Sequence, residues 1–489
     1  MLICAVLAST MAFVDESVVN VALPRMEADL HTSLSAMQWV INAYTLCMSA
    51  LLLIGGAAGD RFGRRRIFMI GISVFAVASV ACGLAPNPGA LIGARALQGV
   101  GAAFLIPCGL ALISAVYDEQ ERGAAIGVWS GASAVAAGAG PILGGWIVDH
   151  TSWRAIFLIN PILAVPALWI AVRYLAESRE TENDSSLDWA GALSVFLGLG
   201  AIVYGLIAAA AVGWGDVTVS GTIVAGIVLL LIFLRIEARS AAPMVPLGLF
   251  QSRQFSGVNV VTLLLYGALS GTFFFVPFLI IQVHGYSAAA AGAIFIPFAV
   301  ILGGLSKWSG RLMDRFGARW PLIIGPTIAA VGLLLLALLS EDGRYFAFIV
   351  PIVVLAFGMA ITIAPLTTTV LNAVQQEQTG VASGINNAAA SVAGLLVIAV
   401  MGTVALRVLD LEIDAQVRRA RPSAAVRHEV EAARGGFVMP QASTHLSLEE
   451  RTSVQEIAKA SFGGTMYLVL LVMAALAFAG ASVAVLMIE

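Results

Sequence analysis

The residues Gly56-Ala-Ala-Gly-Asp-Arg-Phe-Gly-Arg-Arg-Arg66 form a short charged segment between two long apolar runs. It returns as Gly310-Arg-Leu-Met-Asp-Arg-Phe-Gly-Ala-Arg319, an offset of 254 residues between Gly56 and Gly310. Both copies read Gly-x-x-x-Asp-Arg-Phe-Gly-x-Arg, and each joins the same kind of apolar segment on both sides. A period of this length is too long for a solenoid unit and indicates two related halves of a membrane protein.

The composition places the whole chain in a lipid bilayer. Of 489 residues, 60% are hydrophobic and 11% are charged, and the mean hydropathy is +0.94. A soluble domain carries about 25% charged residues. Apolar runs recur at the length of about 20 residues that a helix needs to cross the hydrocarbon, whereas a membrane β-barrel would show short alternating segments. The net charge of −3 gives no reason to expect nucleic acid as a partner.

Fourteen apolar runs are candidate transmembrane helices, so we expect an all-α polytopic membrane protein. The first run starts at Met1, holds two acids and ends at Pro24, which favours a retained span over a cleaved signal. The expected spans are 2–24, 37–59, 67–85, 90–117, 123–147, 154–172, 188–210, 218–236, 255–282, 288–309, 320–339, 346–369, 381–405 and 463–487.

The repeat divides these helices into three groups. The first copy of the loop follows the second span and the other copy follows the tenth, so six helices before and six after a central pair explain the offset. We therefore expect a first half over residues 1–172, a two-helix insert with its linkers over 173–254, and a second half over 255–489. This is a 6+2+6 arrangement, and the long polar segment 407–462 belongs to the second half.

Arginines in the short loops set the orientation. If the N-terminus is inside, the inner loops hold most of them, among them the arginines of both loop copies, and the short outer loops hold few. Both termini should then be cytoplasmic, and segment 407–462 lies outside. Ser447-Leu-Glu-Glu450 resembles a helix capping box, so a short surface helix is expected to follow it, with Val454, Ile457, Ala458 and Phe462 on one apolar face. A plain surface excursion is favoured over a lid there.

Two ionisable residues lie deep in the expected spans. Asp15 precedes Pro24 by nine residues, about 13.5 Å of helix, which places its carboxylate near the middle of the bilayer. Arg95 lies roughly 9 Å into the fourth span. The pair either holds two helices together or forms a site where Asp15 gains and loses a proton, and intramembrane charges favour the second interpretation. Glu16 is turned about 100° away on its helix and is a weaker candidate.

The fifth span is unusually rich in glycine. It carries Gly127, Gly140, Pro141, Gly144 and Gly145, although glycine costs a helix about 1 kcal/mol per residue in water. Small residues allow another helix to approach closely. Taken alone, this density indicates tight membrane packing and no more.

Taken together, the motifs resemble the major facilitator superfamily, and within it the 14-helix drug:proton antiporter family. Gly56 with Asp60-Arg-Phe-Gly-Arg-Arg-Arg66 is similar to the signature between the second and third helices. Leu91–Ala103 is similar to the fourth-helix motif, and the glycines of the fifth span match the antiporter motif, with Ala136 in place of one glycine. Phe13–Pro24, which carries Asp15, resembles the first-helix motif of the 14-helix branch. The likeness covers nearly the whole chain.

The resemblance implies export of small organic compounds, including drugs, driven by inward proton flow through alternating access, with Asp15 and Arg95 as the proton-coupling residues. It also implies an inner charge network that latches one conformation. From the residues alone this cluster could equally be a topology signal, but the doubled Asp-Arg-Phe-Gly favours the latch. Its residues would be Gly56, Asp60, Arg61, Gly63, Arg64, Glu121 and Arg122, with Asp314, Arg315 and Gly317 as the second copy.

The substrate cavity is expected between the halves near the middle of the membrane. The sequence departs from relatives after Asn386 and Asn387, where they carry a basic residue, so coupling should reside in the first half. Each lining candidate taken singly fits packing better than substrate contact. The candidates are Glu16, Asn42, Tyr44, Trp129, Asn160, Tyr266, Phe274, Thr362 and Asn386.

The expected partners are a small-molecule substrate, protons and the lipid bilayer of the cell membrane, and a monomer is expected from the resemblance. An exporter of one dedicated metabolite, or another solute transporter of the superfamily, is the alternative. No catalytic motif lies at a suitable site, so we do not expect an enzyme. The four cysteines have no metal-like spacing, and neither a metal nor a cofactor is expected.

Overall fold

The computed structural model describes residues 1–117, 119–178, 188–240, 243–375, 378–431, 434, 439 and 445–488. Inside the helices, the side chains at 53, 119–124, 127, 130, 134, 306–307, 310 and 314 are not among those described. Four predicted site residues therefore lie outside the described side chains: Glu121, Arg122, Gly127 and Asp314.

All regular secondary structure in the described part of the chain is helical. Thirteen helical segments are long and apolar enough to cross a membrane, and α2, bent by 49° after Leu52, brings the number to fourteen. This confirms the expected number of spans. The helices are α1 (Leu2–Asp29), α2 (Leu34–Phe62), α3 (Arg64–Gly83), α4 (Pro88–Val116), α5 (Glu119–His150), α6 (Ala155–Tyr174), α7 (Trp189–Val212), α8 (Val217–Glu237), α9 (Arg253–Phe278), α10 (Ala288–Ala293), α11 (Ile296–Phe316), α12 (Arg319–Leu339), α13 (Tyr345–Asn372), α14 (Thr379–Ala420), α15 (Ala424–Glu431) and α16 (Leu448–Met487), with the short turns η1 (Leu247–Gln251) and η2 (Leu279–Val283).

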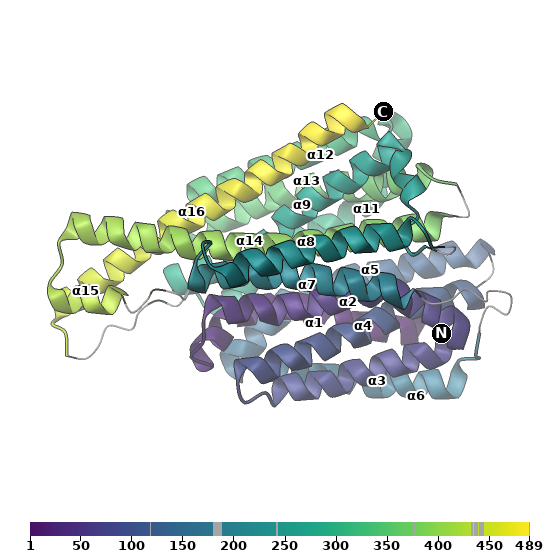
Figure 1. Ribbon diagram of the computed structural model, residues 1–489, viewed down its shortest axis with the longest axis horizontal. Helices are drawn as coiled ribbons and strands as arrows, with labels where there is room; N and C mark the ends of the chain where they lie inside the picture. The colour runs from purple at the N-terminus through teal and green to yellow at the C-terminus, as the bar shows by residue number, and fades with distance from the viewer. Residues whose placement is uncertain are drawn as a thin grey trace.

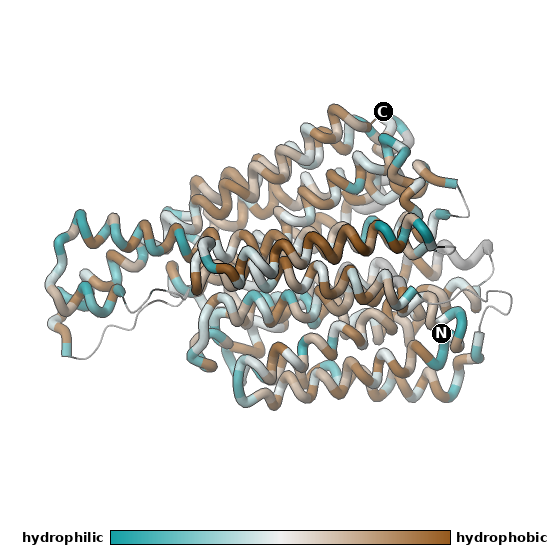
Figure 2. The backbone as a smooth tube through the Cα atoms, viewed as in Figure 1, coloured by the Kyte–Doolittle hydropathy of each residue, from teal (hydrophilic) through white to brown (hydrophobic). Residues whose placement is uncertain are grey.

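The helices run side by side along the long axis of the molecule, and the two chain termini lie at the same end (Figure 1). We call this the proximal end and the opposite end, where α1 finishes and α2 begins, the distal end. Brown apolar segments fill the middle of the bundle, and teal hydrophilic residues gather toward both ends (Figure 2). This distribution is typical of a protein whose middle lies in hydrocarbon.

Helix packing follows the sequence repeat. In the first half α1 packs on α5 and α6, and α4 packs on α2 and α3. In the second half α9 packs on α14 and α16, and α12 packs on α13 and α16. The pair α7 and α8 pack on one another, while α7 also contacts α2 of the first half and α14 of the second. We propose the 6+2+6 division on this packing.

The segment between the last two spans forms a helical projection at the distal end, at the left of Figure 1. The capping box of Ser447 and Glu450 is present, but the separate surface helix expected after it is wrong, because α16 continues unbroken to Met487. Helices α14 and α16 have 42 and 40 residues, about 60 Å each, which is roughly twice the hydrocarbon thickness. The predicted apolar face of Val454 and Phe462 is buried.

The projection is fixed by its own contacts. Arg434 forms an ion pair with Asp414 at 2.5 Å and another with Asp410 at 3.4 Å. The backbone N–H of Met439 donates to Oε1 of Gln282 at the distal end of the second half, at 3.2 Å. The projection is therefore an ordered extension of the second half.

Candidate functional site

The centre of the first half is a fully buried ion pair between α1 and α4. Asp15 is 0% exposed and Arg95 is 1% exposed. Nη1 of Arg95 donates to Oδ2 of Asp15 and also to Oε1 of Gln98, at 2.7 Å, while its Nε donates to the carbonyl of Val40 at 3.0 Å. The two residues whose depths the sequence predicted are thus in direct contact.

Two amides complete the shell of the Asp15 carboxylate. Oδ1 accepts from Nε2 of Gln98 at 2.8 Å and from Nδ2 of Asn160, on α6, at 2.8 Å. Both amides also donate to Oγ of Ser79 on α3, at 2.7 Å and 3.1 Å. A buried carboxylate is tolerated only when it is paired and hydrogen-bonded. Here α4 and α6 supply those partners, and Ser79 of α3 accepts the remaining N–H of each amide. Asn160 was predicted as a cavity residue, but it lies in this shell.

Sequence analysis missed Gln98 and Ser79 as site residues. Gln98 lies three residues after Arg95 and so shares its helix face, which was a readable signal inside the fourth-helix motif. Ser79 is one of several small polar residues in apolar spans, and nothing local distinguishes it. Its role depends on how α3 packs against α4 and α6.

Aromatic rings cover the guanidinium. Cζ of Arg95 lies 4.3 Å from the ring centre of Tyr44 and 6.0 Å from that of Phe157, distances at which a cation is attracted to a ring face. Within the described structure, the hydroxyl of Tyr44 and both amide atoms of Asn42 are buried without a hydrogen-bond partner. These groups are available to a partner that enters the site.

Glu16 occupies a different environment from its neighbour. Its side chain is exposed, although α1 is surrounded by α2, α4, α5 and α6 of its own half and by α9 and α10 of the other. The carboxylate therefore faces interior space rather than lipid. It lies within electrostatic range of Arg95, but the Arg95 charge is already paired with Asp15. With both carboxylates ionised, the formal charges of Asp15, Glu16 and Arg95 sum to −1, and the unpaired charge is that of Glu16.

The other cavity candidates fall into two groups. Trp129 and Tyr266 are partly exposed, and the indole N–H of Trp129 donates to Oγ of Ser9 at 2.7 Å. Phe274 and Thr362 are fully buried, and the Thr362 hydroxyl donates to the carbonyl of Gly358, one turn earlier in its own helix.

In the second half Asn386 is buried. Its Nδ2 donates to Oγ1 of Thr262 at 2.7 Å and to Oδ1 of Asn259 at 3.1 Å. These contacts join α14 to α9 by neutral groups only.

The glycines of α5 serve two different neighbours. A Cβ placed on Gly140 would overlap Oγ of Ser17, and one on Gly144 would overlap Val18, so this face lies against α1. A Cβ on Gly145 would overlap the carbonyl oxygen of Ala288, on α10 of the second half. Pro141 lies on the second face, with its carbonyl against Gly292 of α10.

The repeated loop lies at the proximal end. Arg64 donates to Oδ1 of Asp60 at 2.7 Å, one helical turn earlier. Gly63 has φ of +104° and a Cβ there would lie 2.6 Å from the carboxyl carbon of Glu177, which explains why glycine stands at this turn. Glu177 accepts the backbone N–H of Arg65 at 3.0 Å and of Arg66 at 3.2 Å, and so caps α3.

Glu177 was not predicted, because it follows α6 in a linker whose folding back is a tertiary feature. Within the described residues, the partners of Asp60, Arg64 and Glu177 lie in the first loop copy and in the linker that follows α6. Gly56 lies near Pro107 of α4, and Arg61 is exposed, with Cζ 5.6 Å from the ring centre of Phe62. The second copy shares the exposed arginine, Arg315, and the glycine of positive φ, Gly317 at +71°, but has Ala318 where the first copy has Arg64.

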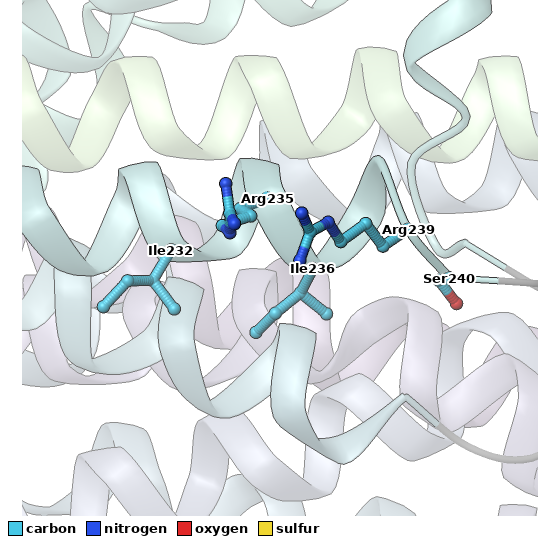
Figure 3. Close-up of a pocket in the computed structure, with 5 residues that line it drawn as sticks. All are labelled: Ile232, Arg235, Ile236, Arg239 and Ser240. Carbon is cyan, nitrogen blue, oxygen red and sulfur yellow. The ribbon is translucent and has the colours of Figure 1, made fainter.

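A surface hollow at the proximal end of α8 is separate from this centre. Figure 3 shows its lining, which comes from α8 and the turn after it: Ile232, Arg235, Ile236, Arg239 and Ser240. Helix α8 is the least buried of the candidate spans, and arginines at the end of such a helix are suited to lipid headgroups.

Comparison with known proteins agrees with the fold and the motifs. The chain is 33% identical over 479 residues to the tetracenomycin C resistance and export protein of Streptomyces glaucescens, covering 97% of this chain and 88% of that one. It is 32% identical to the multidrug resistance protein Stp of Mycobacterium tuberculosis (strain CDC 1551 / Oshkosh), covering 86% and 78%.

A bacterial homologue of the human lysosomal transporter Spinster, solved in an inward-facing, unoccupied conformation, superimposes with a TM-score of 0.66 at 17% identity, covering 99% of this chain and 97% of that one. The family model of the Major Facilitator Superfamily matches residues 5–190 and 188–398. The chain therefore belongs to the major facilitator superfamily, a family of membrane transporters rather than enzymes.

Proposed function

We propose that the protein is a proton-coupled antiporter that exports small organic compounds by alternating access. The single observation that carries this proposal is the buried Asp15 centre, a carboxylate at membrane depth held by Arg95, Gln98 and Asn160. A titratable group inside a span is functional by default, because a purely structural contact could be made by neutral residues at lower cost. The names of the relatives, which state resistance and export, support the direction of transport.

Proton exchange at Asp15 would change the charge of the whole centre. When Asp15 is ionised, Arg95 is neutralised, and the first half is held together across α1, α4 and α6. When Asp15 is protonated, Arg95 keeps an unpaired buried charge, which is costly enough to favour a rearrangement of these helices. This difference between the two protonation states can drive a conformational equilibrium.

Glu16 supplies the proposed contact for cargo. It is accessible between the halves, and its charge is not neutralised by an ion pair within the described residues. An organic cation with apolar groups would match one carboxylate close to the ring of Tyr44. An exporter of one dedicated compound is the second candidate, because the name of the Streptomyces glaucescens relative specifies a single compound.

We propose the cell membrane as the location, with both termini cytoplasmic and the proximal end inside. The arginines of the two repeated loops lie at that end, as expected for inner loops. A monomer is proposed from the resemblance to the family alone. The proximal loop then acts as the inner latch, in which Asp60 and Arg64 exchange their present pairing for contacts with the second half when the inner side closes.

The test is ΔpH-driven transport in everted vesicles from an efflux-deficient host, with ethidium as the probe. We expect Asp15→Asn to abolish ΔpH-driven ethidium movement while membrane levels stay unchanged. Asp29→Asn, an exposed acid at the distal end of the same helix, is the matched control and should transport normally. Residual ΔpH-dependent transport by Asp15→Asn would show that the coupling site lies elsewhere.

A further inference from the structure

The distal ends of the two halves are in direct contact through α5 and the α10–α11 segment. Gly138 lies against Ala299, Gly145 against Ala288, and Pro141 against Gly292. At the latter two positions a Cβ on the glycine would overlap a backbone carbonyl of the opposing helix, so the two backbones meet without intervening side chains. This face of α5 is a seam between the halves.

Asp149 closes the distal end of this seam. It lies one helical turn beyond Gly145, in the last turn of α5. Its Oδ1 accepts the N–H of Ala288 at 3.0 Å, and its Oδ2 accepts the N–H of Ala289 at 2.7 Å. Both N–H groups belong to the first turn of α10 and have no acceptor within that helix. One carboxylate of the first half thus binds the backbone of the second half with both of its oxygens.

A second distal contact supports the same closure. Nε2 of Gln38, in the first turns of α2, donates to the carbonyl of Ile398 on α14 at 2.6 Å. It is a neutral contact, whereas that of Asp149 is charge-assisted and roughly twice as strong. The halves are therefore joined at the distal end by a charged contact next to a surface where the backbones touch.

We propose that Asp149 is a positioning residue for transport, whose carboxylate holds the distal gate closed by binding the first two amides of α10 across the boundary between the halves. To open the distal side, α5 must leave α10, and both hydrogen bonds must break together. The two hydrogen bonds consequently shift the equilibrium between the distal-open and distal-closed conformations toward the distal-closed one described here. Because Asp149 is exposed, water can solvate its carboxylate once the gate opens, so the latch is reversible.

The distribution of conformations tests this proposal directly. The full-length protein, with Cys4, Cys47, Cys82 and Cys108 replaced, is placed in lipid nanodiscs and spin-labelled for distance measurement. One label pair reports the distal side, at the exposed positions Pro86 and Glu341, and a second reports the proximal side, at the exposed positions Arg173 and Gln375. Opening of the distal gate lengthens the first distance and shortens the second.

We expect Asp149→Ala to raise the ratio of distal-open to distal-closed molecules about tenfold, since hydrogen bonds to a charged group are lost. Asp149→Asn, which keeps one acceptor, should give a smaller rise, and Asp149→Glu should return the ratio toward that of the unmodified chain. Asp29→Ala, which removes an exposed acid at the same end, is the control and should leave both distances unchanged.

A longer distal distance together with a shorter proximal distance supports the role of Asp149. A loosened fold would broaden both distance distributions without linking their changes. Unchanged distributions in Asp149→Ala, or broadening of both together, would overturn that role. The inference rests on the alternating access of the proposed function but not on proton coupling. If Asp149→Ala leaves the distances unchanged while ΔpH-driven transport is intact, only the role of Asp149 is refuted. If the distances shift reciprocally but the protein shows no ΔpH-driven transport, only the proton coupling is refuted.

Discussion

At the scale of single residues, the proposed transport chemistry depends on how Asp15 and Glu16 differ. They are adjacent in sequence, but their side chains leave the helix about 100° apart. Asp15 turns into the four-helix centre and has every oxygen occupied, while Glu16 turns toward the space between the halves. Proton exchange and cargo contact can therefore be assigned to different carboxylates, and each can be removed separately.

The amide shell of Asp15 gives the first residue-scale prediction. Asn160→Ala removes one donor to Oδ1, and Gln98→Ala removes another together with the acceptor of Arg95. Because a hydrogen bond to a charged group is worth about 1.5–3 kcal/mol, each change should slow ΔpH-driven ethidium transport tenfold or more. Asn372→Ala, an exposed asparagine at the proximal end of α13, should have no effect in the same assay.

The charge of Glu16 gives the second residue-scale prediction. Glu16→Gln removes the accessible charge and leaves the Asp15 centre intact, so binding of ethidium by the purified protein should weaken about tenfold. The uncharged compound chloramphenicol serves as the comparison, and its export should change little. Equal losses of binding or export for both compounds would contradict a role of Glu16 in binding the positive charge of a substrate.

At the scale of elements, α5 is the helix that packs against both halves at the distal end. One of its faces, with Gly140 and Gly144, fits α1, and the other, with Gly138 and Gly145, fits α10 and α11. The first contact lies within a half, and the second lies between halves. The glycines of α5 thus allow close packing on α1 within the first half and close packing on α10 and α11 across the halves. The sequence indicated close packing but not which helices take part in it.

Substitution of these glycines should separate the two faces. At Gly145 an added methyl group meets the backbone of Ala288, across the boundary between the halves, whereas at Gly144 it meets chiefly a side-chain methyl group of Val18, within the first half. We expect Gly145→Ala to favour the distal-open conformation and Gly144→Ala chiefly to lower thermal stability. Gly131→Ala in the same helix, with no atom within 4 Å of its Cβ, should change neither the spin-label distances nor the melting temperature.

At the scale of the whole molecule, the repeat and the projection give the bundle two different ends. The charged loops and both termini occupy the proximal end, and the helical projection of α14, α15 and α16 occupies the distal end (Figure 1). The described contacts between the halves by Gln38, Asp149 and the α5 seam are distal. The conformation is therefore closed at the distal end.

The proposed orientation can be checked on intact cells with a membrane-impermeant maleimide. Cysteines placed at Pro86 and at Arg427 of α15 should react without permeabilisation, because both are exposed and distal. A cysteine at Arg61, exposed at the proximal end, should react only after permeabilisation. The reverse pattern would invert the topology and with it the assignment of inner and outer gates.

Much of this molecule was readable from the sequence. Length and hydropathy determine the number of spans, because the bilayer sets one length for every crossing helix. The repeat marks the halves, and the depth of Asp15 and Arg95 follows from the helical rise. Even the face that carries Val454 and Phe462 was correct, although the helix that carries it proved to be the start of α16.

Other features were decided by tertiary structure alone. The contacts of Ser79, Glu177 and Asp149 depend on which helix lies opposite them, and the neighbours of a helix inside a bundle leave no periodic signal in its sequence. The same holds for Asp15 and Glu16, since periodicity fixes the angle between two side chains but not the surroundings that each one meets. Local physics determined the elements and their depths, whereas packing between distant helices decided which charges are paired, which remain accessible, and which end of the transporter is closed.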